Sequence, residues 1–122
     1  GVPAGEEHWP FRRHEATARS MLDGGAVWAR EIKRPAGEQS PGIVDHENRR
    51  ALRLADYFET VIDDPVFAGD LNKPQLLLFC ALDLERRIPA FDWRTRRPKL
   101  GDWFERMNRL PAVRASLPPG GA

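Results

Sequence analysis

One apolar stretch, from Leu76 to Leu84, restricts the fold of this chain more than any other feature. It contains a single charged residue, Asp83, so a helix built from it would be apolar on almost every side. In a soluble chain, a helix without a polar face has to be enclosed by other parts of the protein. The stretch therefore predicts a core helix around which the remaining elements pack.

The residues just before this stretch predict where the core helix begins. Asn72 can cap the helix, and Gln75, three residues later, can bond back to the Asn72 amide, which makes a capping box. Leu71 and Leu76 flank the box at the positions of a hydrophobic staple. Two independent start signals thus coincide at one place in the chain.

Apolar residues also recur every three or four positions in other segments, whereas no segment combines strand-like alternation with hairpin turns. The other predicted helices cover residues 10–34, 40–63, 100–110 and 112–116. In the first of these, Gly24 and Gly25 each lower helix propensity by about 1 kcal/mol relative to alanine, which allows a bend there. The predicted fold is an all-α bundle of about five helices.

The two ends of the chain differ from its middle. Residues 1–9 combine Gly, Pro and acidic residues without periodicity, and residues 118–122 consist of Pro, Gly and Ala. We expect an interdomain linker over 1–9, one helical domain over 10–117 and a tail over 118–122. A chain of 122 residues suits one hydrophobic core.

Charge and composition exclude several classes of partner. The 19 basic and 18 acidic side chains leave a net charge of +1, so the chain lacks the long-range field that nucleic-acid or anionic-membrane binding needs. The longest apolar run is far shorter than the ~20 residues that cross a bilayer, and no signal-peptide pattern opens the chain. With Cys80 as the sole cysteine, no disulfide can form within the chain. We expect a soluble, cytoplasmic protein with no nucleic-acid or membrane partner.

Three segments resemble, in order and spacing, the C-terminal all-helical domain of bacterial-type cytosolic glutathione transferases. Residues 15–23 are similar to the family's first helix of this domain, and residues 67–76 to its capped core helix. Residues 98–107, with Pro111-Ala112-Val113 and Pro118, resemble its closing pattern of Pro-x-Leu, Trp, Arg and Pro-x-Val. The chain departs from the family at Asn72 and Gln75, which replace the usual Ser or Thr and Asp.

This resemblance implies a role for the chain within a larger protein. In the family, glutathione and the catalytic Ser, Tyr or Cys belong to a preceding thioredoxin-like domain, whose strands this sequence does not contain. We therefore expect no catalytic residue and no cofactor in this chain, with glutathione as co-substrate of the parent protein. The chain would form the hydrophobic, electrophile-binding side of the cleft and part of the surface of a homodimer. A non-catalytic protein-interaction module of the same fold is the alternative.

The first predicted helix carries the candidate substrate-binding residues. Beside a stripe of mainly small residues, it has a second apolar stripe consisting of Met21, Gly25, Trp28 and Ile32. This second stripe could line the substrate cleft, because it would be exposed wherever a partner domain is removed. Ordinary packing within the bundle is the competing interpretation, and the sequence leaves both open.

Arg19 is the candidate glutathione contact. It lies near a position that reaches glutathione across the dimer in some family members, and a guanidinium can form paired hydrogen bonds with a carboxylate. Related sequences have Asp-Gly where this chain has Arg19 and Ser20. A solvated surface charge on the helix is the favoured alternative.

Three other chemical features receive structural interpretations. Cys80 lies inside the apolar stretch, where burial disfavours a thiolate, so we expect a core residue. The three histidines are far apart in the sequence, which predicts surface or capping groups and no metal site. A basic cluster could contact phosphate and make the chain a nucleic-acid binder, but nearby Asp92 and Asp102 favour a solvated surface. The cluster comprises Arg94, Arg96, Arg97 and Lys99.

Overall fold

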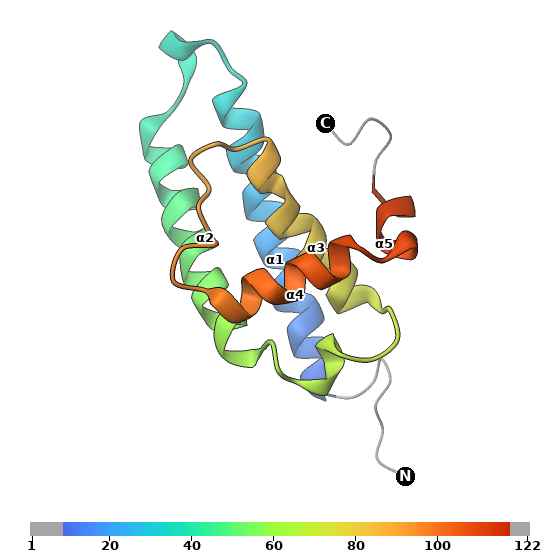
Figure 1. Ribbon diagram of the computed structural model, residues 1–122. Helices are drawn as coiled ribbons and strands as arrows, with labels where there is room; N and C mark the ends of the chain where they lie inside the picture. Colours follow the sequence, from blue (N-terminus) through green and yellow to red (C-terminus); the bar gives the residue numbers. More distant parts are fainter. Residues whose placement is uncertain (1–8, 118–122) are drawn as a thin grey trace.

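The computed structural model describes residues 9–117, and in this range every regular element is helical (Figure 1). The α-helices are α1 (Trp9–Ile32), α2 (Pro41–Val61), α3 (Lys73–Asp83), α4 (Pro98–Asn108) and α5 (Pro111–Ala115), with 3-10 turns η1 (Ala36–Glu38), η2 (Pro65–Phe67) and η3 (Leu84–Arg86). The predicted all-α bundle of five helices is confirmed. Helix α1 begins at Trp9, one residue earlier than expected, and the expected linker before it and the tail from 118 to 122 lie outside the described residues.

Helix α3 supplies the centre of the core. Helix α1 lies between α2 and α3, and α4 crosses the bundle and contacts both α2 and α3 (Figure 1). Leu78, Phe79 and Leu82 are completely buried, and the Phe79 ring stacks on Phe104 with centroids 4.6 Å apart. The predicted core helix is confirmed, although one side of it, which includes Leu76 and Cys80, is only half-buried.

The predicted capping box is present at the start of α3. The Asn72 side chain accepts a hydrogen bond from the Gln75 amide at 3.0 Å, and Gln75 Oε1 accepts one from the Asn72 amide at 3.2 Å. Both side-chain amides also donate to the Val66 carbonyl, and Gln75 Nε2 donates to the Gly69 carbonyl as well. A carboxylate could not donate these bonds, so Gln75 ties the preceding turn to α3 as well as capping it.

The adjacent glycines of α1 allow two neighbours to approach closely, and the helix runs through them without interruption. A Cβ added at Gly24 would lie 2.9 Å from Glu47 Oε1, and one added at Gly25 would lie 2.5 Å from Leu84 Cδ1. Helix α2 covers the first position, and Leu84 at the start of η3 covers the second. The glycines thus serve close packing on two sides of α1.

One arginine fixes the connection between α3 and α4. Arg97 donates to Asp56 Oδ1 at 2.8 Å and to the carbonyls of Leu52, Trp93 and Thr95 at 3.2–3.4 Å. Its side chain is only 12% exposed. The connection is therefore held against α2 by bonds that span more than 40 residues of sequence.

Replacing Arg97 with alanine should lower the free energy of unfolding by about 1–3 kcal/mol, because the part-buried carbonyls of Leu52 and Trp93 lose a donor. Urea denaturation of the 122-residue chain measures this. Arg96→Ala is the matched control, since Arg96 is exposed and makes no side-chain hydrogen bond within the described residues. Equal losses for the two variants would show that Arg97 does not anchor the connection.

Candidate functional site

The predicted apolar stripe of α1 lies mostly inside the bundle. Met21 and Trp28 are 2% and 1% exposed, and the Trp28 ring packs 5.5 Å from that of Phe91. Gly25 is covered by the side chain of Leu84, and Ile32 is half-buried against the core. The structure thus brings the four positions to one side of α1, in the packing arrangement that the sequence left open. Of the four, only Ile32 retains substantial exposure.

Half-buried apolar side chains also lie on one side of α3. Leu76, Cys80 and Asp83 follow one another at three- and four-residue spacing, so they share one side of the helix. Leu76 and Cys80 are both half-buried. This side, defined by Leu76 and Cys80 and called the open face of α3 below, is the best candidate surface for a covering domain.

Cys80 has the properties of a structural thiol. Burial raises its pKa above the ordinary value for cysteine, and the negative charge of Asp83 raises the pKa further. A thiol with a raised pKa is mostly protonated at neutral pH and is a weak nucleophile. Cys80 therefore borders the open face of α3 as an apolar group.

Arg19 lies on the solvent-exposed side of α1. Its side chain is half-exposed and forms an ion pair with Glu15, one turn earlier, at 3.4 Å. The neighbouring Ser20 hydroxyl accepts a hydrogen bond from Arg50 of α2. This surface position is compatible with both a glutathione contact and a solvated surface charge. Exposed ion pairs of this type stabilise a helix little.

His14 is the residue that the sequence interpretation misplaced. It is 5% exposed, with Nε2 3.3 Å from Asp64 Oδ2 and Nδ1 3.4 Å from the Tyr57 hydroxyl. The expectation of a surface histidine is therefore wrong for this position. The burial of His14 could have been predicted from its spacing, because Phe11, His14 and Ala18 recur at three- and four-residue intervals on the buried side of α1. The described residues hold no group of three or more side chains suited to a metal ion.

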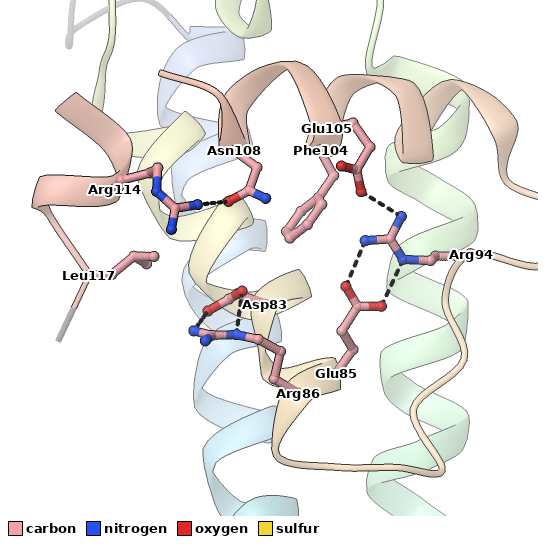
Figure 2. A pocket seen from close by; sticks show the side chains of 9 residues that line it. All are labelled: Asp83, Glu85, Arg86, Arg94, Phe104, Glu105, Asn108, Arg114 and Leu117. Carbon is pink, nitrogen blue, oxygen red and sulfur yellow. Dashed lines mark hydrogen bonds and ion pairs between the residues drawn. The ribbon is translucent and has the colours of Figure 1, made fainter. Parts of the chain in front are cut away.

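A pocket of about 220 Å³ lies between the end of α3, α4 and α5 (Figure 2). Figure 2 shows Arg94 between two carboxylates, with two bonds of 2.8 Å to Glu85 and an ion pair of 2.9 Å to Glu105. The Arg94 guanidinium also lies over the rings of Trp93 and Phe104, at 4.6 and 4.9 Å from their centroids. These two carboxylates raise the pKa of Arg94, with the Glu85 hydrogen bond as the main cause.

The two other arginines of this pocket are also hydrogen-bonded within the fold. Arg86 forms an ion pair with Asp83, and Arg114 donates to Asn108 at 3.2 Å (Figure 2). Because its charged side chains already have hydrogen-bond partners within the fold, the pocket presents little unmet polar capacity to a ligand. The charges here hold α5 and the connection before α4 in place.

Most of the basic cluster that includes Arg94 is neutralised within the fold. Arg97 pairs with Asp56 and Lys99 with Asp63, both on or next to α2. Among the cluster's members, Arg96 alone makes no ion pair within the described range, and it has a left-handed backbone with φ of 65°. Residues that neutralise one another in this way contribute little to the counterion release that drives phosphate binding.

No described helix is both long enough and apolar enough to cross a lipid bilayer.

Comparison with known proteins gives matches in structure but none in sequence. No protein-family model matches the chain, and no curated protein does. A glutathione transferase family member from Pseudomonas fluorescens Pf-5, solved with bound S-(propanoic acid)-glutathione, superposes with a TM-score of 0.80 at 21% identity. A second structure of a glutathione transferase family member from the same organism, with bound glutathione, superposes with a TM-score of 0.81, also at 21% identity.

The two superpositions cover 98% of this chain but only 64% and 60% of those chains. This chain thus spans less than two thirds of the length of the proteins that it matches. The resemblance predicted from the sequence is confirmed at the level of the fold, which is the helical fold present in these two structures.

Proposed function

Because the chain has a helical fold found in glutathione transferase family members, we propose that it forms the electrophile-binding half of a glutathione transferase. The observation that carries this proposal is the match over 98% of the chain to a glutathione transferase family member solved with bound glutathione and with a glutathione conjugate. Glutathione is the co-substrate, bound by a thioredoxin-like domain outside this chain, and the second substrate is a small hydrophobic electrophile. Catalysis is attack of the glutathione thiolate on that electrophile, with the thiolate stabilised by the other domain.

The open face of α3 supports the existence of a covering domain. Leu76 and Cys80 are half-buried apolar groups on the helix that forms the centre of the core. Covering them removes apolar surface from water, which contributes roughly 25 cal/mol per Å². The thioredoxin-like domain is the proposed partner for this face.

The electrophile is proposed to bind near the C-terminal end of α1. Ile32 is the member of the predicted stripe that retains exposure, whereas Met21, Gly25 and Trp28 support the wall from beneath. Arg19, which is exposed, is proposed as a contact for a carboxylate of glutathione, and its weak pair with Glu15 would compete for that contact.

The parent protein is proposed to be a cytoplasmic homodimer, with α1 and α2 contributing part of the dimer surface. Ile43, at the start of α2, is 42% exposed, so it is an apolar side chain that a partner subunit could cover. A single cysteine that forms no disulfide fits a reducing compartment. Since the other domain would complete the dimer surface, the 122-residue chain alone is expected to be monomeric.

The proposal is tested on the protein encoded by the complete reading frame and on the 122-residue chain, assayed side by side. Glutathione binding is measured by calorimetry, and conjugation is measured with a panel of apolar electrophiles. The whole protein is expected to bind glutathione and to conjugate at least one electrophile, while the chain alone does neither. The Ile32→Asp variant of the whole protein should raise KM for the electrophile with glutathione binding unchanged.

Two outcomes would contradict the proposal. A whole protein that binds no glutathione and turns over no electrophile would favour the interaction module of the same fold. An Ile32→Asp variant with unchanged KM would remove the C-terminal end of α1 from the substrate site, even if the protein is a transferase.

A further inference from the structure

A second hollow, separate from the pocket of Figure 2, lies between the turn that precedes α3 and the end of α4. Its volume is about 230 Å³. Leu71 and Leu110, two of the four exposed large apolar side chains of the described residues, stand at its rim with 38% and 44% exposure. Trp103 and Met107, both buried, form part of its wall. The position is therefore an apolar hollow that opens to solvent beside the capping box.

The polar side chains in the wall of this hollow are already bonded within the fold. Gln75 is 2% exposed, and its amide makes three hydrogen bonds, to Asn72, Val66 and Gly69. Trp103 Nε1 donates to the Phe67 carbonyl at 3.0 Å. Because these groups already have partners within the fold, the wall offers mainly apolar contact.

Arg106 is the exception among the lining residues. It is exposed, and it forms no ion pair or side-chain hydrogen bond with any other described residue. A free guanidinium beside an apolar hollow complements a molecule with an apolar body and one carboxylate.

We propose that this hollow binds a small apolar monocarboxylate, with its ring or branched alkyl group against Trp103, Met107 and Leu110 and its carboxylate on Arg106. The volume is below the roughly 300–1,000 Å³ of pockets that enclose drug-sized ligands, which limits the ligand to about one ring. A ligand of that size binds with a dissociation constant of about millimolar. The inference is independent of the proposed function, because the hollow shares no residue with the proposed electrophile site.

The experiment is an NMR titration of the 122-residue chain with two probes of the same shape, 3-phenylpropanoate and the neutral 3-phenylpropanamide. Shifts are expected at the backbone amides of Gly69, Leu71 and Leu110, which border the hollow. The carboxylate should bind about threefold to fivefold more tightly than the amide, the range of an exposed charge-assisted pair. Higher salt should narrow this difference.

Two variants connect the preference to Arg106. Arg106→Gln should abolish the preference for the carboxylate probe and leave binding of the amide probe unchanged. Arg109→Gln removes a neighbouring exposed charge outside the hollow, so this variant should retain the preference for the carboxylate probe. Spectra of both variants report whether the fold is intact.

Several results would overturn the proposal. One is equal affinity of the unsubstituted chain for the two probes, and another is a set of chemical-shift changes that maps to other elements. A third is no binding at probe concentrations up to about 20 mM, several times the expected dissociation constant. Loss of the preference in Arg109→Gln to the same degree as in Arg106→Gln would also do so, since net charge alone would then explain it.

Discussion

Phe79→Ala is expected to lower the free energy of unfolding by about 3–5 kcal/mol, the largest loss for any single substitution considered for this chain. The Phe79 side chain is completely buried on α3, and its ring lies nearly parallel to that of Phe104, with an interplanar angle of 7°. Alanine would leave a cavity at the junction of α3 and α4 and remove this ring contact. Since small domains are stable by only about 5–15 kcal/mol, the variant should be close to unfolding at 37 °C.

Urea denaturation followed by circular dichroism measures this effect, and Leu76→Ala is the matched control on the same helix. Leu76 lies on the half-buried open face of α3, so its loss in the 122-residue chain should be about 1 kcal/mol or less. If the two substitutions cost the same, α3 is not oriented in the bundle as the structure shows.

Gln75→Glu is expected to cost about 3 kcal/mol at pH 7, the second large effect. The Gln75 side-chain NH2 group donates to the carbonyls of Val66 and Gly69 at 3.0 and 3.2 Å. An ionised carboxylate cannot donate to either carbonyl, so the Gly69 carbonyl loses this donor, while the Val66 carbonyl keeps its bond from Asn72. A part-buried acceptor left without a donor costs about 1–3 kcal/mol. Burial of the new charge adds to this cost.

The stability loss in Gln75→Glu should depend on pH, and the sign follows from its surroundings. Burial and the two facing carbonyls disfavour the ionised form, so they raise the pKa of the new carboxyl in the folded state. The penalty is therefore largest at pH values above this raised pKa and shrinks as the pH falls, when the protonated carboxyl can donate to one carbonyl. Unfolding measured between pH 7 and pH 4 should show the variant approaching the unsubstituted chain. A pH-independent difference would contradict this account of Gln75.

The helices were predictable from the sequence because their signals are local. The Asn72–Gln75 box lies within four residues of the start of α3, and the proline at Pro41 follows the cap Ser40 at the start of α2. The apolar periodicity of α1 also predicted its buried stripe. What periodicity could not decide was whether this chain or another domain covers Trp28, because that depends on the position of Phe91, more than sixty residues away.

The charged and polar contacts were not predictable for the same physical reason. Arg97 bonds to residues 41 and 45 positions earlier in the chain, and His14 to residues 43 and 50 positions later. The sequence shows where Arg97 lies in the chain, but it does not show that the Arg97 side chain will bond to Asp56 and Leu52 of α2. The hollow beside Arg106 likewise forms only when the turn before α3 meets the end of α4.

Hydrogen exchange of the 122-residue chain tests most directly whether α3 is the helix on which this fold depends. The backbone amides of Leu78, Phe79 and Leu82 are expected to exchange only through complete unfolding, so their exchange free energies should equal the free energy from urea denaturation. Amides of α5, a helix of five residues, should exchange more readily. Exchange of the α3 amides well below the global free energy would show that the bundle is not organised around α3.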